Sequence, residues 1–364
     1  MKICYISPLG SIHTYKSIKY FYDLWYEIHC IWNEKISNRI EWINYYSFDE
    51  KIKNNFFLKI YIFRIIFFTI YWIKKIKKIN PDITHLQFIW FWSLIALFYK
   101  SRKLITTIWW SDILVIPKKI PLFKIIVNKI LQKSDIIIMD WYNVKKEVLS
   151  YWNYESKIKM IWFWIDTNIF KKDITLKWNN ARIKIISLRA LKSIYNISTI
   201  IKAAKILKEN NEDFEINIYW DWAEKDNLIN MRDELWLKNY VIFKWKYNHN
   251  ELSKYLNESD IYISVSLSDS WLAVSTGEAM SCWLPVIVTD NADNSKWIIN
   301  YENWFVIPNK SPEKLAEKIS YFINNKDNIN KMWDKNISII SNKNNYYREM
   351  NKINNIYKEL NKKS

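Results

Sequence analysis

Glycine is almost missing from this sequence. The chain has 2 glycines among 364 residues, whereas an average chain of this length has roughly 25, and turns with positive φ depend on them. Tryptophan is in excess by a similar number, with 22 residues, although exchanging the smallest side chain for the bulkiest has no packing rationale. UGA encodes glycine in some bacterial lineages, and such a gene read with UGA as tryptophan would have this composition. We therefore predict that most of these tryptophans are glycines in the natural protein; a truly tryptophan-rich chain would scatter them without regard to turns.

Cysteine is also scarce. Cys4, Cys30 and Cys282 lie far apart without a CxxC spacing, which excludes a disulfide framework or a zinc ribbon and favours a reducing compartment. No three-part signal peptide follows Met1, so we expect a cytoplasmic protein. Half of the residues are hydrophobic and a quarter are charged, which excludes a disordered or collagenous chain. The length suggests two domains.

Basic residues outnumber acidic ones, and the excess is larger in the first part of the chain than in the second. Residues 1–170 have 25 Lys and Arg against 13 Asp and Glu, a net charge of +12, whereas residues 171–364 have 29 against 24, a net charge of +5. A basic first part predicts contact with an anionic surface, either a membrane or a nucleic acid. A codon bias towards lysine in an AT-rich gene explains the same charge equally well.

Short apolar runs alternate with helical stretches along the whole chain, which predicts an α/β fold with parallel sheets. The pattern loosens between residues 171 and 180, where we expect the linker between the two domains. The expected strands are Lys2–Ser7, Glu27–Ile31, Asp82–Leu86, Leu104–Thr107, Asp135–Met139, Lys157–Ile161, Lys184–Leu188, Glu215–Tyr219, Tyr240–Phe243, Asp260–Val265 and Pro285–Thr289. The expected helices include Pro312–Asn324, Gly277–Cys282 and a final helix, Asn344–Leu360, that buries Tyr347, Met350, Ile353 and Tyr357.

The stretch Asn55–Ile73 is long and apolar enough to raise the question of a membrane. It contains Lys59 and Arg64, which are costly at the centre of a bilayer, and four lysines follow it. We expect a helix packed in the first domain; a helix lying in the membrane interface is the main alternative, and a membrane span is the least favoured.

The most informative run is Ser264–Asp290, in which a strand, a polar loop, a helix and a second strand form a βαβ unit. Ligands bind such units at the carboxyl end of the first strand, and amides at the start of a helix suit a phosphate. We expect that helix to open at Gly277–Glu278, so that Glu278 either accepts hydrogen bonds from ribose hydroxyls or only complements the helix dipole. The polar residues expected at this strand end are Ser268, Asp269, Ser270, Ser275 and Thr276.

The segment EAMSCWLPVIVTD in this run resembles the EAM…G.PVI..D signature of the retaining glycosyltransferases of family 4. Further segments resemble the family in the same order along nearly the whole chain, among them TIWWSDIL, IWFWIDTNIF and IYWDWAEKDNL. Tryptophan stands where the family has glycine at Trp25, Trp110, Trp164, Trp220, Trp222, Trp236, Trp245, Trp283 and Trp304. Trp109 and Trp297 do not fall on such positions, and we expect them to be true tryptophans.

The resemblance implies the GT-B fold, which consists of two Rossmann-like domains that face a cleft. The implied domains are an acceptor-side domain at 1–170, a nucleotide-sugar domain at 171–342 and a last helix at 343–364 that returns to the first domain. It implies transfer of a sugar, with retention of configuration, from a nucleotide diphosphate sugar to a hydroxyl of a glycan or a lipid-linked acceptor. The alternatives are a sugar-nucleotide 2-epimerase of the same fold and a catalytically inactive, membrane-associated scaffold.

The resemblance also implies roles in the second domain. Glu278 matches the family's ribose-binding acid, and the other acid of its Glu-x7-Glu motif falls on Ser270, so that either Asp269 or Ser270 faces the sugar. Arg189 matches the arginine that holds the diphosphate; the family's lysine falls near Tyr195, and Lys192 replaces it only if the loop bends. Ser275, Thr276 and Gly277 line the phosphate-binding helix start, and Trp220 and Trp222 replace the two glycines beside the nucleotide.

In the first domain, Gly10 and Ser11 follow the first strand and are expected beside the donor sugar. His13 either binds acceptor or phosphate or only starts a helix, and His85 either contacts the acceptor or, with more weight, is structural. Asp112 either caps the loop or contacts acceptor hydroxyls.

No metal or other cofactor is expected, because the family rarely needs one and the chain has no Asp-x-Asp. Once the resemblance is taken into account, the expected partners are a nucleotide sugar, a glycan or lipid-linked acceptor and an anionic membrane surface, with no nucleic acid. The expected place is the cytoplasm, at the inner face of the plasma membrane, in the synthesis of a cell-envelope polysaccharide.

Overall fold

The computed structural model of the chain describes residues 1–32, 40–47, 61–162, 165–175, 182–219, 224–244, 248–269, 272–291, 294–325 and 329–362. These residues divide into two compact units. The first unit comprises Met1–Trp162 together with Arg348–Ser364, and the second comprises Phe163–Tyr347. The last stretch of the chain therefore belongs to the same unit as the first.

The first unit is built on a parallel sheet with the strand order β3-β2-β1-β4-β5-β6-β7. Its central strands are buried on both faces, as parallel strands covered by helices are; β1 is an example, with Ile3, Cys4 and Tyr5 inaccessible to solvent. The strands are β1 (Lys2–Ile6), β2 (Glu27–Trp32), β3 (Asn44–Ser47), β4 (Ile83–Gln87), β5 (Leu104–Thr107), β6 (Ile136–Met139) and β7 (Ile158–Met160).

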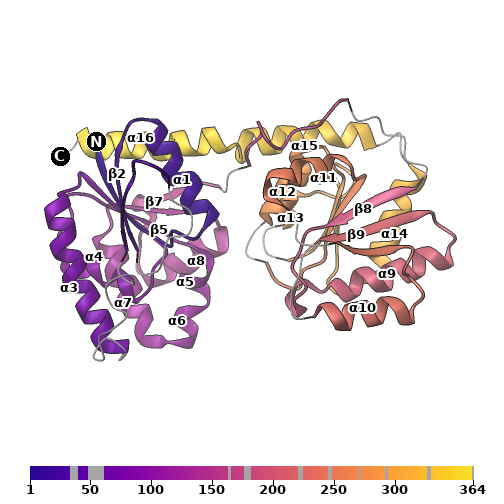
Figure 1. Cartoon of the computed structure of the whole chain (residues 1–364), viewed down its shortest axis with the longest axis horizontal. Coiled ribbons are helices and arrows are strands. Elements are labelled where there is room, and N and C mark those ends of the chain that lie inside the picture. The colour runs from indigo at the N-terminus through magenta and orange to yellow at the C-terminus, as the bar shows by residue number, and fades with distance from the viewer. Residues whose placement is uncertain are drawn as a thin grey trace. The chain divides into compact units, whose positions relative to one another are not determined.

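Helices cover both faces of this sheet (Figure 1). On one face α4 packs against both α3 and α7, and α16, most of which belongs to this unit, packs Tyr357 against Phe21 of α1. The helices are α1 (Ile12–Asp23), α3 (Tyr61–Ile79), α4 (Ile95–Phe98), α5 (Trp110–Leu114), α6 (Ile116–Lys119), α7 (Pro121–Lys133), α8 (Tyr142–Tyr151) and α16 (Tyr346–Lys362).

The second unit has a parallel sheet with the order β10-β9-β8-β11-β12-β13. Helix α9 packs against α10 and α14, and α12 packs against α15, and Figure 1 shows these two groups on opposite faces of the sheet. The strands are β8 (Ile183–Ser187), β9 (Phe214–Tyr219), β10 (Val241–Lys244), β11 (Ile261–Ser264), β12 (Val286–Thr289) and β13 (Phe305–Ile307). The helices are α9 (Ile197–Glu209), α10 (Lys225–Glu234), α11 (Leu252–Asn257), α12 (Val274–Ser281), α13 (Asn294–Trp297), α14 (Pro312–Asn324) and α15 (Ile329–Lys343).

The expected α/β class with parallel sheets is confirmed, and every expected strand exists. Two details differ. Helix α12 begins at Val274, three residues before the expected Gly277. In α16 the buried tyrosine of the first turn is Tyr346, whereas Tyr347 is exposed, because the buried face of α16 continues from Met350 back by one full turn to 346.

The apolar stretch expected as a helix between residues 55 and 73 corresponds to α3, whose described part begins at Tyr61; residues 55–60 lie outside the described part of the chain. Phe68, Trp72, Ile76 and Ile79 of α3 are buried at helical spacing, so this helix packs on its unit along one face. None of the described helices combines the length and the hydrophobicity that a membrane span needs.

Candidate functional site

The second sheet changes its direction of growth at β8. The chain first adds β9 and β10 on one side of β8 and then adds β11, β12 and β13 on the other. Ligands of open α/β sheets bind outside the carboxyl ends of the strands at such a point. Arg189 follows β8 by two residues and Asp269 follows β11 by five, so the topology brings together two residues that are 80 positions apart.

Arg189 is held on two sides. Its Nη2 donates a hydrogen bond to Oδ2 of Asp269 at 2.7 Å, and its guanidinium lies over the ring of Tyr195, 4.2 Å from the centroid. The side chains of both Arg189 and Asp269 are largely buried. The Nε of Arg189 is buried and makes no hydrogen bond with any described residue, so a planar cation stands at the switch point with donor capacity to spare.

The loop after β8 bends back on itself. The backbone N–H of Lys192 bonds to the carbonyl of Ala190 at 2.8 Å, and Tyr195 N–H bonds to the carbonyl of Lys192 at 2.9 Å. The next contact ties this loop to the one after β11, because Leu267 N–H donates to the carbonyl of Ile194 at 2.8 Å. The loop is therefore turned at Lys192, and the role of Lys192 in binding the diphosphate stays a prediction.

The start of α12 is fixed to the neighbouring strand. The hydroxyls of Ser275 and Tyr262 are 2.8 Å apart, and Thr276 Oγ1 donates to the same Tyr262 oxygen at 3.4 Å. Because α12 begins at Val274, Gly277 and Glu278 lie beyond its first three residues, so the expectation that Glu278 stands in the first turn is wrong. Glu278 is 3% exposed, a burial that a carboxylate needs a partner to offset.

Gly277 is a packing residue in the structure. A β-carbon built on it would stand 2.9 Å from Cδ1 of Ile165, in the segment where Ile165 also pairs with Asn345. The residue therefore lets α12 approach Ile165, and its backbone N–H already bonds to the carbonyl of Ala273 at 3.1 Å. Three expected site residues, Ser270, Trp220 and Trp222, lie outside the described residues.

The first sheet has its own switch point between β1 and β4. There the Ser7 hydroxyl lies 2.9 Å from that of Thr14 and 2.8 Å from Oε1 of Gln87, and Thr14 Oγ1 lies 3.2 Å from the same Oε1. All three side chains are buried. This cluster braces the loop after β1 against the end of β4. No sequence pattern indicates it, because only the strand pairing shows that Ser7 and Gln87 are neighbours.

The loop itself contains Gly10 and Ser11. Ser11 N–H bonds to the carbonyl of Pro8, and the Ser11 carbonyl accepts from Tyr15 N–H, both at 3.0 Å, so Ser11 starts α1. Gly10 is exposed with open space around its Cα. His13 lies within the first turn of α1, and its side chain is outside the described part.

His85 is not placed as an acceptor contact. It is fully buried, its Nδ1 is hydrogen-bonded with the Tyr357 hydroxyl, and its Nε2 lies 2.7 Å from the Thr107 hydroxyl. Burial lowers the pKa of His85 to about 3, so the ring stays neutral. The structural alternative for this residue holds: it joins β4 to α16.

Asp112 caps the loop before α5. Its Oδ2 accepts the backbone N–H of Ile89 at 2.9 Å and of Trp109 at 3.1 Å. The side chain is inaccessible to solvent, which excludes direct contact with an acceptor in this conformation, and burial raises its pKa to about 8. Asp140, which follows β6, is also buried, and its pKa is raised by burial and by Asp112.

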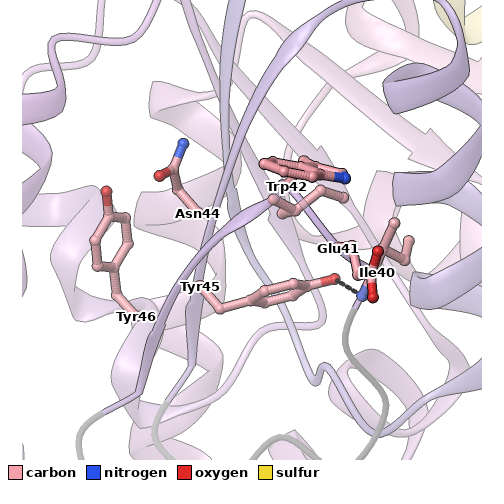
Figure 2. A pocket seen from close by; sticks show the side chains of 7 residues that line it. Ile40, Glu41, Trp42, Asn44, Tyr45 and Tyr46 are labelled. Carbon is pink, nitrogen blue, oxygen red and sulfur yellow. Dashed lines mark hydrogen bonds between the residues drawn. The ribbon is translucent and has the colours of Figure 1, made fainter.

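A pocket of about 440 Å³ lies elsewhere, lined by residues 40–46 (Figure 2). Tyr45 Oη accepts the Ile40 N–H at 3.2 Å across it, and the Trp42 indole forms one wall. Residues 40–43 lead into the amino end of the edge strand β3, to which residues 44–46 belong, whereas ligands of such sheets bind at carboxyl ends. Among the described residues, no group of three or more His, Cys, Asp or Glu side chains could hold a metal ion.

Comparisons with known proteins agree with this architecture. The profile of the family "Glycosyl transferases group 1" matches residues 168–338, and that of "Glycosyl transferase 4-like" matches residues 2–140. A search of curated protein sequences finds no match.

Solved structures share the fold over the whole chain. Sucrose-phosphate synthase from Thermosynechococcus elongatus has a TM-score of 0.81 at 13% identity, with 100% of both chains covered. A glycosyltransferase from Rickettsia africae has a TM-score of 0.80 at 21% identity, covering 100% of this chain and 99% of that one. HepE of Anabaena, solved in complex with UDP-glucose, has a TM-score of 0.75 at 14% identity, covering 99% of this chain and 100% of that one.

Proposed function

Because the chain belongs to the group 1 glycosyltransferases and has their GT-B fold, we propose that it is a retaining hexosyltransferase. The donor is a nucleoside diphosphate sugar, and the acceptor is a hydroxyl of a glycan or of a lipid-linked saccharide. That HepE of Anabaena was solved with UDP and with UDP-glucose supports a uridine diphosphate donor as the first to test.

The observation that carries this proposal is Arg189. A largely buried guanidinium stands at the carboxyl end of β8, where the sheet changes direction, and its Nε has no partner among the described residues. A diphosphate would supply acceptors for this cation, and charged hydrogen bonds of that kind are among the strong ones. Lys192 lies on the same loop, and the start of α12 adds the backbone amide of Ser275, whereas the N–H of Thr276 already bonds to the carbonyl of Ala273 at 2.8 Å.

The remaining roles follow from the same arrangement. Glu278, buried on α12, is proposed to accept hydrogen bonds from the ribose hydroxyls. Either Asp269 or Ser270 is proposed to reach the sugar, with Asp269 leaving Arg189 when the donor binds. In the first unit, Gly10, Ser11 and His13 are our candidates for contacts with the donor sugar and the acceptor.

The chemistry requires little from the protein beyond charge stabilisation. As the glycosidic bond breaks, positive charge develops on the sugar and negative charge on the departing diphosphate. Arg189 and the amides of α12 stabilise that leaving group, which is the kind of preorganised electrostatic effect that contributes most to catalysis. The departing phosphate can accept the proton of the incoming hydroxyl, so the mechanism does not need a protein base.

The proposed place of action is the cytoplasmic face of the plasma membrane, in the assembly of an envelope polysaccharide. The basic charge of residues 1–170 supports this place. The acceptor would then be presented by the membrane.

The test is a product analysis with a panel of uridine, guanosine and adenosine diphosphate sugars and lipid-linked acceptors. We expect a new glycoside whose anomeric proton coupling in NMR matches that of the donor. A product with inverted configuration would refute retention, release of a 2-epimer without transfer would identify an epimerase, and no turnover with any donor would favour an inactive scaffold.

A further inference from the structure

Helix α3 shows an apolar face to solvent. Phe63, Ile66, Phe67 and Ile70 are each about half exposed, and their spacing of three and four residues places them on one side of the helix. The opposite side carries the buried residues Phe68, Trp72, Ile76 and Ile79, which pack on the rest of the unit. An exposed helical stripe of four large apolar side chains is uncommon on a soluble surface and marks an interaction site.

The same face becomes cationic towards the end of the helix. Lys74, Lys77 and Lys78 are exposed and continue the stripe at spacings of four, three and one residues. No acidic residue occurs in α3. The face thus joins an apolar half to a positive half along one helix, which is the composition of helices that lie in a membrane interface.

The neighbouring helices also expose apolar and basic side chains. Helix α4 packs between α3 and α7, and Phe98 at its end is 70% exposed. On α7, Leu122 and Ile125 are more than half exposed. Four lysines nearby are exposed as well, Lys118 and Lys119 of α6 and Lys124 and Lys129 of α7.

We infer that the exposed face of α3, extended by Phe98, Leu122 and Ile125, docks on an anionic lipid bilayer. The apolar side chains enter the interface, and the lysines bind the headgroups. The apolar half of the face favours a bilayer over a nucleic acid, since phosphate contacts alone would leave those side chains in water. The biological use of this docking, delivery of a lipid-linked acceptor, rests on the proposed function.

Vesicle co-sedimentation of the full-length chain tests the inference with two triple variants. One is Lys74→Gln, Lys77→Gln and Lys78→Gln; the other is Phe63→Ser, Ile66→Ser and Ile70→Ser. The matched controls in the second unit are Lys202→Gln, Lys205→Gln and Lys238→Gln, and Ile169→Ser, Ile174→Ser and Ile299→Ser, all exposed positions. One set of vesicles contains phosphatidylcholine alone, and the other contains phosphatidylcholine with roughly 30% of the anionic lipid phosphatidylglycerol.

We expect wild type to sediment with the anionic vesicles and to dissociate at high salt, because exposed charges are screened. Each lysine near the surface strengthens binding roughly fivefold, so the lysine variant should lose on the order of a hundredfold. The serine variant removes three half-exposed apolar side chains and should also lose on the order of a hundredfold. The controls should bind as wild type does. Equal binding by the lysine variant and wild type would overturn the inference, and so would a serine variant that binds fully, which would leave only general attraction to polyanions.

UDP binding and thermal melting are measured on the same variants, because the changed side chains point to solvent and should alter neither. If wild type binds vesicles but no nucleotide sugar, the docking inference stands and the proposed function fails. If wild type binds the nucleotide sugar but no vesicles, the docking inference fails and the proposed function stands.

A second inference rests on a different observation, the way three helices end. At the end of α12, Trp283 N–H bonds to the carbonyl of Met280 at 3.2 Å, and Leu284 N–H bonds to that of Ala279 at 3.0 Å. Trp283 itself has φ 64°. These two bonds around a left-handed residue define the Schellman motif, whose left-handed position is usually glycine.

Helices α1 and α10 end in the same motif. Trp25 has φ 62° and Trp236 has φ 56°. In each case the next residue makes the longer-range bond of the motif, with Tyr26 N–H donating to the carbonyl of Phe21 and Leu237 N–H donating to that of Arg232. Their indoles are 94% and 82% exposed, so nothing packs on them that would offset the steric penalty of the β-carbon.

Two more tryptophans have positive φ. Trp42, the wall of the pocket in Figure 2, has φ 71° and is 86% exposed. Trp304 has φ 122°, in a region that is close to glycine-only. Unlike Trp25, Trp42 and Trp236, Trp304 is fully buried, and its Nε1 has no hydrogen-bond partner among the described residues. Neither of the two glycines has a positive φ.

Positive φ is uncommon for residues other than glycine and mostly restricted to Asn and Asp, as at Asn211 in the Schellman motif that ends α9. We infer that the natural chain has glycine at positions 25, 42, 236, 283 and 304. The backbone at these five positions adopts conformations that suit glycine, whereas Trp72 is buried in regular helix. Trp110 lies in α5 and has no positive φ, so its backbone conformation does not indicate a glycine at this position.

Peptide mass spectrometry of the protein from its native cells tests this inference directly. Glycine masses at positions 25, 236 and 283 are expected, and tryptophan masses there would overturn it. A recombinant series adds a second readout: Trp236→Gly should raise the melting temperature by about 2–4 °C, whereas Trp236→Ala keeps the β-carbon and should not. Equal melting of these two variants would show that the left-handed backbone does not demand glycine.

Discussion

Arg189 and Asp269 form an ion pair at 2.7 Å across the ends of two neighbouring strands, β8 and β11. The pair occupies the place where the sheet topology predicts a ligand. Asp269 therefore holds one arm of the guanidinium until a diphosphate arrives, and Tyr195 supports the guanidinium from its face. Since the carboxylate and the diphosphate are both anionic, they compete for the same cation.

Asp269→Asn should tighten the binding of UDP. The amide keeps the size of the side chain and an oxygen for Arg189, but it removes a negative charge close to the diphosphate. One such charge contributes about 1 kcal/mol in a screened environment, which is roughly a fivefold change in affinity. Titration calorimetry at low salt measures it. Weaker binding would show that the carboxylate acts mainly by orienting Arg189.

Arg189→Ala should weaken UDP binding by roughly 1.5–3 kcal/mol, the contribution of a charged hydrogen-bonding group. Arg189→Lys should recover only part of the loss, because an ammonium lacks the fork and the planar contact with Tyr195. Arg182→Ala serves as the control, since Arg182 lies just before the amino end of β8 and bonds to the carbonyl of Phe214 at 2.8 Å. Equal affinities of the Arg189→Ala and Arg182→Ala variants would mean that the donor site is misplaced.

Glu278→Gln should weaken UDP binding by about tenfold while leaving the affinity for 2′,3′-dideoxy-UDP unchanged. The reason is that only UDP has the ribose hydroxyls that would donate to the carboxylate, so only UDP loses a charged acceptor in the variant. The same calorimetric titration with both nucleotides makes the comparison. A loss of equal size for the two would assign Glu278 a structural role in α12.

Acid should destabilise the first unit through His85. Its pKa is lowered by burial from 6.5 to about 3, so the unfolded chain takes up a proton below pH 6.5 that the folded chain refuses. The free energy of unfolding should therefore fall from pH 6.5 towards pH 3, by up to about 1.4 kcal/mol per pH unit. His85→Gln should flatten this dependence in urea titrations at pH 7, 6 and 5. Parallel slopes for the two proteins would refute it.

Strong local patterns were sufficient for most of the fold. The strand expected at Leu104–Thr107 and the helix expected at Pro312–Asn324 match β5 and α14 residue for residue. The proline at the first helical position fixes the start of α14. Strand β3 was missed because its four residues, Asn44–Ser47, contain no aliphatic side chain. Strand β13 was missed although its three residues, Phe305–Ile307, are all apolar, and the polar α15 was missed because it is rich in asparagine.

The candidate site could be predicted only in part. The sequence pointed to Arg189 and Asp269 separately, but their pairing depends on the order of strands in the sheet. The buried cluster of Ser7, Thr14 and Gln87 has no local signature, since Ser7 and Gln87 are 80 residues apart. His85 shows the opposite problem: a histidine at a strand end is compatible with catalysis until the partners of both ring nitrogens are known.

The hydrogen bonds of Tyr357 with His85 and, at 2.9 Å, with Tyr5 have a consequence for the synthesis of the protein. Met350 and Tyr357 are fully buried in a unit whose other residues end at Trp162. During translation the ribosome must therefore make the whole of the second unit before the first can close its core. Until then the amino-terminal part of the nascent chain has part of its apolar interior exposed. All residues of the second unit have been synthesised before the last helix of the first unit. The order of folding is thus expected to be the reverse of the order of synthesis.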